Sequence, residues 1–154
     1  MALEMENASP AKKAQLDEVA TLILEIYRTL VRMRYLDDEW IQEGPHDIEA
    51  LIPMYRSYNL DDSIIYLYSI LPYVDTGGAE YQDFFQGGRF ADFRLEEGVE
   101  RGRDPFHEDG TLLPPYMTPL SLLGNHQSVI FYNARRHWIS ICDHESGGST
   151  DHTR

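Results

Sequence analysis

The clearest structural pattern in the sequence is SVIFYNARRHWISIC, residues 128–142. Its two ends, SVIFYN and HWISIC, are rich in β-branched and aromatic residues, which favour strands. The ARR between them suits a hairpin with a loop of about three to five residues. Alternation along the strands predicts that Val129 and Phe131 face the core from the first strand, and Ile139 and Ile141 from the second.

Upstream of the hairpin, residues 16–36 carry an apolar stripe with helical spacing. Apolar side chains recur every three or four residues, and charged residues such as Asp17, Glu25 and Arg28 lie off the stripe. The stripe consists of Leu16, Val19, Ile23, Ile26, Tyr27, Leu30 and Met33. We therefore expect an amphipathic helix that burial of this stripe stabilises.

Prolines divide the region that follows. Gly44-Pro45 predicts the start of a short helix over about residues 45–52, which Pro53 stops or kinks. A second helix is predicted over residues 61–71, capped by Asp61 or Asp62 and closed by Pro72. Its β-branched and aromatic content leaves a strand as the alternative.

Beyond Pro72 the chain turns often, and two short strands are predicted, within GRFADFRL (88–95) and MTPLSLL (117–123). Helices come first and strands follow, without βαβ alternation, which favours an α+β fold. We expect N-terminal amphipathic helices packed on a small, mainly antiparallel sheet that ends in a C-terminal hairpin. The predicted domain spans residues 15–145, between a disordered tail at 1–14 and a flexible tail at 146–154.

Composition narrows the classes of partner. Thirteen basic against twenty-six acidic residues give a net charge of −13 and a pI near 4.7. This charge repels phosphate backbones and anionic membranes, so we expect no nucleic acid and no membrane partner. The single cysteine cannot form an intrachain disulfide, and the first residues lack the layout of a secretory signal. These features predict an intracellular, cytoplasmic protein.

Cys142 and His144 lie two residues apart and invite a nucleophile hypothesis. Side chains at this spacing on a strand are roughly 6.5–7 Å apart, too far for a dependable thiol–imidazole bond. A small, buried apolar role is the favoured interpretation of Cys142.

Histidines and acids concentrate near the C-terminus, which raises the possibility of a metal site. Neither H-E-x-x-H nor paired C-x-x-C occurs, so the sequence predicts no bound metal and no cofactor. The residues concerned are His126, His137, Asp143, His144, Glu145, Asp151 and His152.

The segment GGRFADFRLEEGVERGRDPF, residues 87–106, holds four arginines and five acids. Bidentate arginines could clamp a carboxylate or phosphate. The near balance of sign favours a structural interpretation, in which the arginines neutralise local acids and hold a glycine-rich loop in place.

The motifs GGRFADFR, RDPF, GNHQSVI and GSTD resemble those of a family of filamentous-fungal proteins with the same motif order. More distantly, LIPMY (51–55) followed by turns and a terminal hairpin ending in CDHE (142–145) resembles the SUKH superfamily, which includes the fungal cell-wall synthesis regulator and bacterial toxin-immunity proteins. This resemblance implies an α+β fold and a non-enzymatic, protein-binding role.

The leading hypothesis is an intracellular protein-interaction module that binds a protein through its sheet face or through the arginine- and glycine-rich loop. The alternatives are a metal-dependent or hydrolytic enzyme using His126, Asp143 and His144, and a small-ligand binder. The candidate binding residues are Arg89, Asp92, Arg94, Arg103, Asp104, Asn125, His126 and Trp138.

Overall fold

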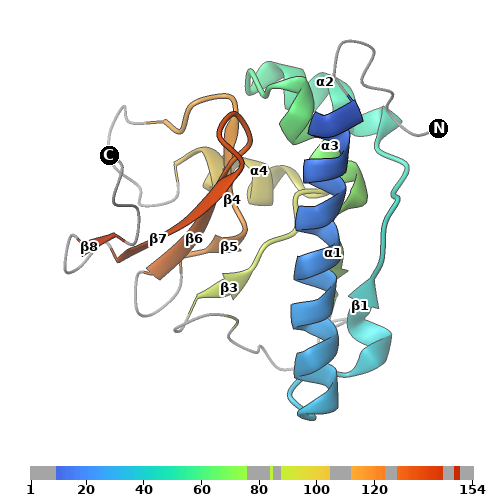
Figure 1. The fold of residues 1–154 in the computed structure, drawn as a ribbon. Coiled ribbons are helices and arrows are strands. Elements are labelled where there is room, and N and C mark those ends of the chain that lie inside the picture. The colour runs from blue at the N-terminus through green and yellow to red at the C-terminus, as the bar shows by residue number, and fades with distance from the viewer. Residues whose placement is uncertain are drawn as a thin grey trace. The chain divides into compact units, whose positions relative to one another are not determined.

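The computed structural model describes residues 10–75, 84, 88–104, 112–123, 128–143 and 148–149, and for residues 143, 148 and 149 it describes the backbone alone. The chain divides into two compact units, Met1–Tyr81 and Gln82–Arg154, called here the N-terminal and C-terminal units. Helices dominate the described part of the first unit, and antiparallel strands that of the second. The fold is α+β, as the sequence predicts (Figure 1).

The long helix of the N-terminal unit is α1, Pro10–Arg32. It begins earlier than the apolar stripe suggests, because proline is well suited to the first turn of a helix. It also ends earlier, before Arg34, whose φ of 61° breaks the helical path. The predicted stripe is buried at Leu16, Val19, Ile23 and Tyr27, whereas its members Ile26 and Met33 are exposed.

The rest of this unit packs around a second, more buried helix. The helix α3, Asp62–Ile70, packs against α1, and every residue from Ser63 to Ser69 is buried. The helix prediction for this segment, with Asp61 as N-cap, is therefore confirmed. Tyr55 and Tyr68 meet edge to face in the core, with ring centroids 5.6 Å apart.

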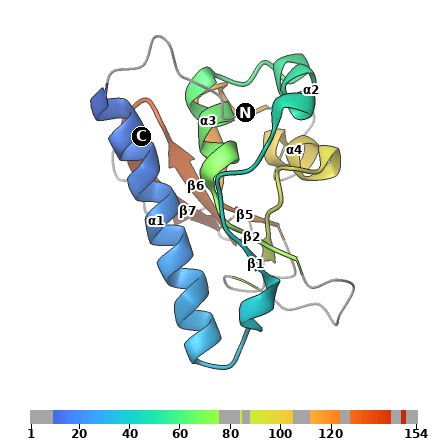
Figure 2. The same ribbon diagram turned by 90° about the vertical axis from the view of Figure 1, so that its right-hand side faces the viewer.

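Shorter elements complete the N-terminal unit. They are η1 (Asp38–Trp40), β1 (Ile41–Gln42), η2 (Glu49–Leu51), α2 (Ile52–Ser57) and β2 (Tyr73–Val74). The strands β1 and β2 pair antiparallel and lie side by side in Figure 2.

The predicted helix over residues 45–52 is wrong. The backbone N–H of His46 donates to Ser69 O at 2.7 Å, which ties this segment to α3 and leaves it non-helical as far as Ile48. The helix starts later, and Pro53 lies in the first turn of α2, where its missing N–H costs no helical hydrogen bond.

In the C-terminal unit, only Arg89–Phe90 of the first predicted strand pairs, as β3. The helix α4, Glu96–Arg103, occupies the segment predicted as a glycine-rich loop. The MTPLSLL segment forms two short strands, β4 (Met117–Pro119) and β5 (Ser121–Leu122). The strands β3 and β5 pair antiparallel.

The predicted hairpin is confirmed as β6, Ser128–Asn133, and β7, Trp138–Asp143. It forms the centre of an antiparallel sheet in the order β4-β6-β7-β8, where β8 is Gly148–Ser149 (Figure 1). Val129 and Phe131 are buried, as predicted.

The core prediction for the second strand is wrong at Ile139, which is 49% exposed, and Ile141 is only half-buried. The register pairs Phe131 with Ser140 and Tyr132 with Ile139. Ser140 therefore shares the face of Val129 and Phe131, and Ile139 lies on the opposite face.

Candidate interaction surface

Several predicted site residues lie within the α4 segment and make internal contacts. Arg94 donates through Nε and Nη2 to the two carboxylate oxygens of Asp92, at 3.0 and 2.8 Å. The backbone N–H of Arg94 also donates to Asp92 Oδ1 at 3.0 Å. This two-pronged pair lies just before α4 and joins side chains that are mostly covered.

Arg103 is buried at the end of α4. Its Nη1 donates to Pro114 O at 3.1 Å and lies 3.5 Å from Leu113 O, and its Nη2 donates to Met117 O. Backbone carbonyl oxygens thus take up the guanidinium and join α4 to the strand β4. A side chain used in this way cannot reach an outside ligand.

The remaining candidates of this segment lie on its exposed side. Arg89 is exposed on β3, and Asp104 follows the last residue of α4. Glu97 and Arg101 form an i,i+4 ion pair at 2.9 Å. Together with Glu100 and Asp104 they line a hollow of about 310 Å³, which is acidic on balance.

The enzyme hypothesis depends on residues that are mostly outside the described part of the chain. Asn125, His126 and His144 lie there, and Asp143 is described only through its backbone pairing with Ser128 and Gly148. Within the described ranges, no group of three or more His, Cys, Asp or Glu residues could hold a metal ion. Nor does any helix among these residues have the length and apolar character needed to cross a membrane.

The tip of the β6–β7 hairpin is a rigid turn. The side chain of Asn133 accepts hydrogen bonds from the backbone N–H groups of Arg135 and Arg136, at 3.0 and 3.1 Å. His137 has a φ of 52°, and its Nδ1 lies 2.9 Å from the hydroxyl of Tyr132. The turn is thus fixed by side-chain bonds as well as by the strand register.

Two exposed arginines extend from this turn over aromatic rings. The guanidinium carbon of Arg135 lies 3.9 Å from the centroid of Tyr116, and that of Arg136 lies 4.9 Å from the centroid of Trp138. Among the described residues neither arginine forms an ion pair with a carboxylate. Cation–π contact orients each guanidinium while leaving its N–H donors open to solvent.

The stretch of sequence that contains these arginines has no acidic residue. From Leu112 to Cys142 the sequence contains no aspartate and no glutamate, although the chain has twenty-six of them. Arg135 and Arg136 are the only lysines or arginines in the same run. The segment from Leu112 to Cys142 therefore carries a positive net charge within a strongly negative protein.

An apolar face adjoins the tip. Ile130 pairs with Ile141, and Tyr132 pairs with Ile139, so these four side chains share one face of the sheet. Tyr132 is buried, Ile130 and Ile141 are half-buried, and Ile139 is exposed. Trp138 precedes Ile139 on β7 and therefore lies on the opposite face of the sheet. We call Tyr116, Arg135, Arg136, Trp138 and Ile139, which lie at the hairpin tip or next to it in the sequence, the hairpin surface.

Of the predicted candidates, only Trp138 belongs to the hairpin surface. The sequence pattern indicates ARR as a connecting loop, and it does not identify either arginine or Tyr116 as a site residue. A usable signal was present, since Arg135 and Arg136 are the only basic pair in an acid-free run. The stacking on Tyr116 depends on the β4–β6 pairing, which places Ala134 N–H against Tyr116 O at 2.9 Å.

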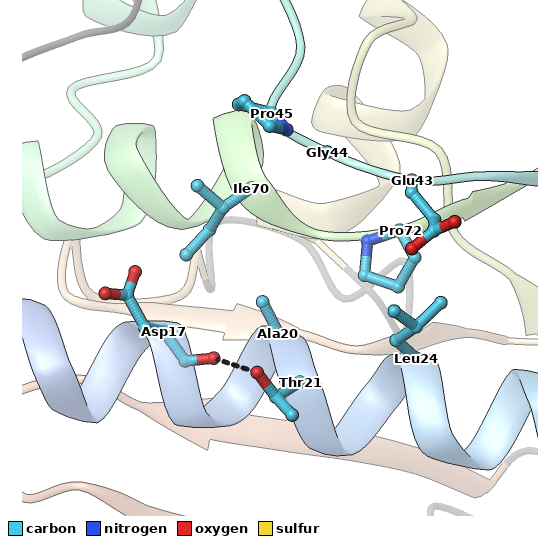
Figure 3. Close-up of a pocket in the computed structure, with 9 residues that line it drawn as sticks. All are labelled: Asp17, Ala20, Thr21, Leu24, Glu43, Gly44, Pro45, Ile70 and Pro72. Carbon is cyan, nitrogen blue, oxygen red and sulfur yellow. Dashed lines mark hydrogen bonds between the residues drawn. The ribbon is translucent and has the colours of Figure 1, made fainter.

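A separate pocket of about 230 Å³ lies in the N-terminal unit (Figure 3). Its walls are largely apolar, and the carboxylates of Asp17 and Glu43 stand at its sides. Glu43 pairs with Arg28 at 2.8 Å. The other residues that line the pocket are Ala20, Thr21, Leu24, Gly44, Pro45, Ile70 and Pro72.

Asp17 also accepts a 2.6 Å hydrogen bond from the hydroxyl of Tyr66. Burial raises the pKa of Tyr66 well above its ordinary value, and the hydrogen bond to Asp17 and the negative charge of Asp17 raise it further. Tyr66 therefore stays a neutral donor at physiological pH and joins α3 to α1.

Comparison of the chain with protein-family models, with curated proteins and with solved structures found no match. The resemblance to filamentous-fungal proteins and to the SUKH superfamily therefore stays a prediction.

Proposed function

We propose that this chain is a non-enzymatic protein-interaction module and that it binds its partner through the hairpin surface. The observation that carries the proposal is the pair of exposed arginines at the hairpin tip, whose guanidinium groups lie over Tyr116 and Trp138. Arginine and aromatic residues are the types enriched where binding energy concentrates in protein interfaces.

The rigidity of the turn supports this proposal. A flexible surface loses conformational freedom when it binds, and this loss opposes association. Here Asn133 fixes the backbone of the turn, and the aromatic rings restrict the arginine side chains before a partner arrives. Part of the conformational entropy that binding would remove is therefore already lost in the folded protein.

The protein-binding role that the SUKH resemblance implies agrees with this proposal. The single cysteine is consistent with a reducing compartment, so an intracellular, cytoplasmic location forms part of the proposal.

Site-specific photo-crosslinking tests the proposed function. Benzoylphenylalanine replaces Ile139 in one variant and Leu22, an equally exposed α1 residue at 45%, in a control variant. In extract of the organism that makes the protein, we expect the probe at 139 to capture a defined protein, and excess unmodified chain to compete it away. Equal capture from both positions, or none from position 139, would contradict the proposal.

The pocket of the N-terminal unit favours a second candidate, a small-ligand binder. Apolar walls with two carboxylates at the sides suit a small organic amine. A thermal-shift series of alkyl amines against the matching alcohols tests this role, since a ligand of the folded state raises Tm. Shifts in Tm that only the amines produce and that Glu43→Gln abolishes would support ligand binding in this pocket. A series without any shift in Tm would contradict it.

A further inference from the structure

We infer that the hairpin surface recognises an acidic segment of a partner protein, in which two carboxylates pair with Arg135 and Arg136 beside an apolar residue. This inference rests on the proposed function and names the chemical class of its partner. It rests on the positive charge of the two arginines in an acid-free run of sequence, and on the guanidinium N–H groups that no carboxylate of the described residues pairs with.

The local charge favours a carboxylate-bearing partner despite the net charge of −13. Charges separated by more than about 8 Å are largely screened at physiological ionic strength, so the field at the tip depends on nearby groups. At the tip, Arg135 and Arg136 lie in a run of sequence without acids, and no carboxylate of the described residues forms an ion pair with either of them. An incoming carboxylate therefore meets cations that no acid of that run offsets.

The two guanidinium groups have donors to offer. Among the described residues no carboxylate forms an ion pair with Arg135 or Arg136. Arg94, in contrast, is paired with Asp92, and Arg103 donates to backbone carbonyl oxygens. Each tip arginine is anchored by a ring face, which leaves the planar N–H fork available. Such a fork matches the two oxygens of a carboxylate.

A nucleic acid is the other polyanion to consider, and the surface fits it less well. Affinity for a phosphate backbone is gained through many cationic contacts, whereas the tip offers two. The remaining acidic surface would repel the rest of an extended phosphate chain. The exposed Ile139 instead suits an apolar side chain within a peptide.

Selection from a random twelve-residue peptide library displayed on phage tests the inference with the full chain as target. We expect the selected peptides to be enriched in aspartate and glutamate relative to the unselected library. In fluorescence anisotropy, replacing the two acids of a selected peptide by their amides should weaken Kd at least tenfold. The double substitution Arg135→Gln/Arg136→Gln in the protein should weaken it to a similar extent.

The matched control is Arg32→Gln/Arg34→Gln, which removes the same charge from exposed positions at the end of α1. We expect it to change Kd less than twofold. An equal loss in this control would show a general charge effect and overturn the inference.

The remaining outcomes separate the inference from the proposed function. Selected peptides without acid enrichment that depend on Ile139, tested as Ile139→Ser, would overturn the inference and leave the proposed function standing. No peptide whose binding responds to Ile139 or to the arginines would overturn both. Tighter, arginine-dependent binding of single-stranded DNA, or self-association that Arg135→Gln/Arg136→Gln abolishes, would replace the acidic partner with a nucleic acid or a second copy.

Discussion

Two arginine-bearing regions of the C-terminal unit use the same side chain in opposite ways. Around α4, Arg103 is buried against carbonyl oxygens and Arg94 is paired with Asp92. At the hairpin tip, Arg135 and Arg136 lie exposed over aromatic rings. The number of internal acceptors, and not the density of arginine in the sequence, distinguishes an arginine that stabilises the fold from one that is open to a partner.

Arg103→Met is the strongest test of the structural half of this comparison. The substitution preserves bulk and leaves the carbonyls of Pro114 and Met117 without their buried donors. We expect the free energy of unfolding to fall by about 3 kcal/mol in urea denaturation. Arg101→Met on the exposed side of α4 is the control and should change it by no more than about 0.5 kcal/mol. If Arg103→Met leaves the free energy of unfolding unchanged, the buried arginine does not stabilise the fold and the comparison is contradicted.

Gly98→Ala probes how closely α4 approaches the turn that holds Asp92. A Cβ at position 98 would lie 2.1 Å from the carbonyl oxygen of Asp92, so backbone must move. We expect a loss of about 2 kcal/mol, because the overlap outweighs the helix propensity of alanine. At Gly102 the nearest atom belongs to the side chain of Phe93, at 3.1 Å, and Gly102→Ala should cost less than half as much. Equal losses would contradict this account of the contact.

Tyr66→Phe extends the comparison to a buried neutral donor in the N-terminal unit. Loss of the hydrogen bond to Asp17 should lower the free energy of unfolding by about 1.5 kcal/mol at pH 8. The folded state raises the pKa of Tyr66, so the stabilisation is fully present below about pH 10 and is lost as the pH rises above it.

Urea denaturation from pH 8 to pH 11 measures this dependence. The advantage of the native chain over Tyr66→Phe should shrink above about pH 10, since the unfolded tyrosine releases its proton first. The phenylalanine variant carries every other tyrosine and so serves as its own control. An advantage that grows with pH would contradict the direction of the pKa shift.

Asp92→Asn tests an intermediate case, because the ion pair of Asp92 with Arg94 is mostly but not fully covered. The amide can still accept a hydrogen bond from the backbone of Arg94, but the charge is lost. We expect a cost of about 1 kcal/mol. Glu97→Gln, which breaks the exposed pair with Arg101, should cost about 0.3 kcal/mol. The reverse order would show that burial does not set the value of these pairs.

Arg135→Gln/Arg136→Gln should have only a small effect on stability. Each arginine loses one exposed cation–π contact, so the free energy of unfolding should change by about 1 kcal/mol or less in total. Arg103→Met in the same denaturation series gives the reference. A loss from the tip variant that equals the loss from Arg103→Met would make the tip arginines structural.

The hairpin and the main helices could be predicted from the sequence because their patterns are local. The periods of α1 and α3 and the β-formers around ARR are each contained within one element. The helix α4 was not predicted because Gly98 and Gly102 are typical of a loop in the sequence. In the structure they allow close approach to Asp92 and Phe93.

The faces of β7 could not be predicted because register decides them. A four-residue turn, 134–137, pairs Asn133 with Trp138, and this register places Ser140 instead of Ile139 beside Phe131. The hairpin surface could not be predicted from the sequence for a similar reason. Tyr116 reaches Arg135 only through the pairing of β4 with β6, which joins segments that the sequence keeps apart.

An NMR titration that follows the arginine Nε–Hε signals distinguishes the arginines that bind a partner from those that stabilise the fold, because it observes both regions at once. The probe is an acidic peptide from the library selection. We predict that the signals of Arg135 and Arg136 and the indole signal of Trp138 shift on binding, while those of Arg94 and Arg103 stay in place. Shifts at Arg94 and Arg103 with none at the tip would contradict the account.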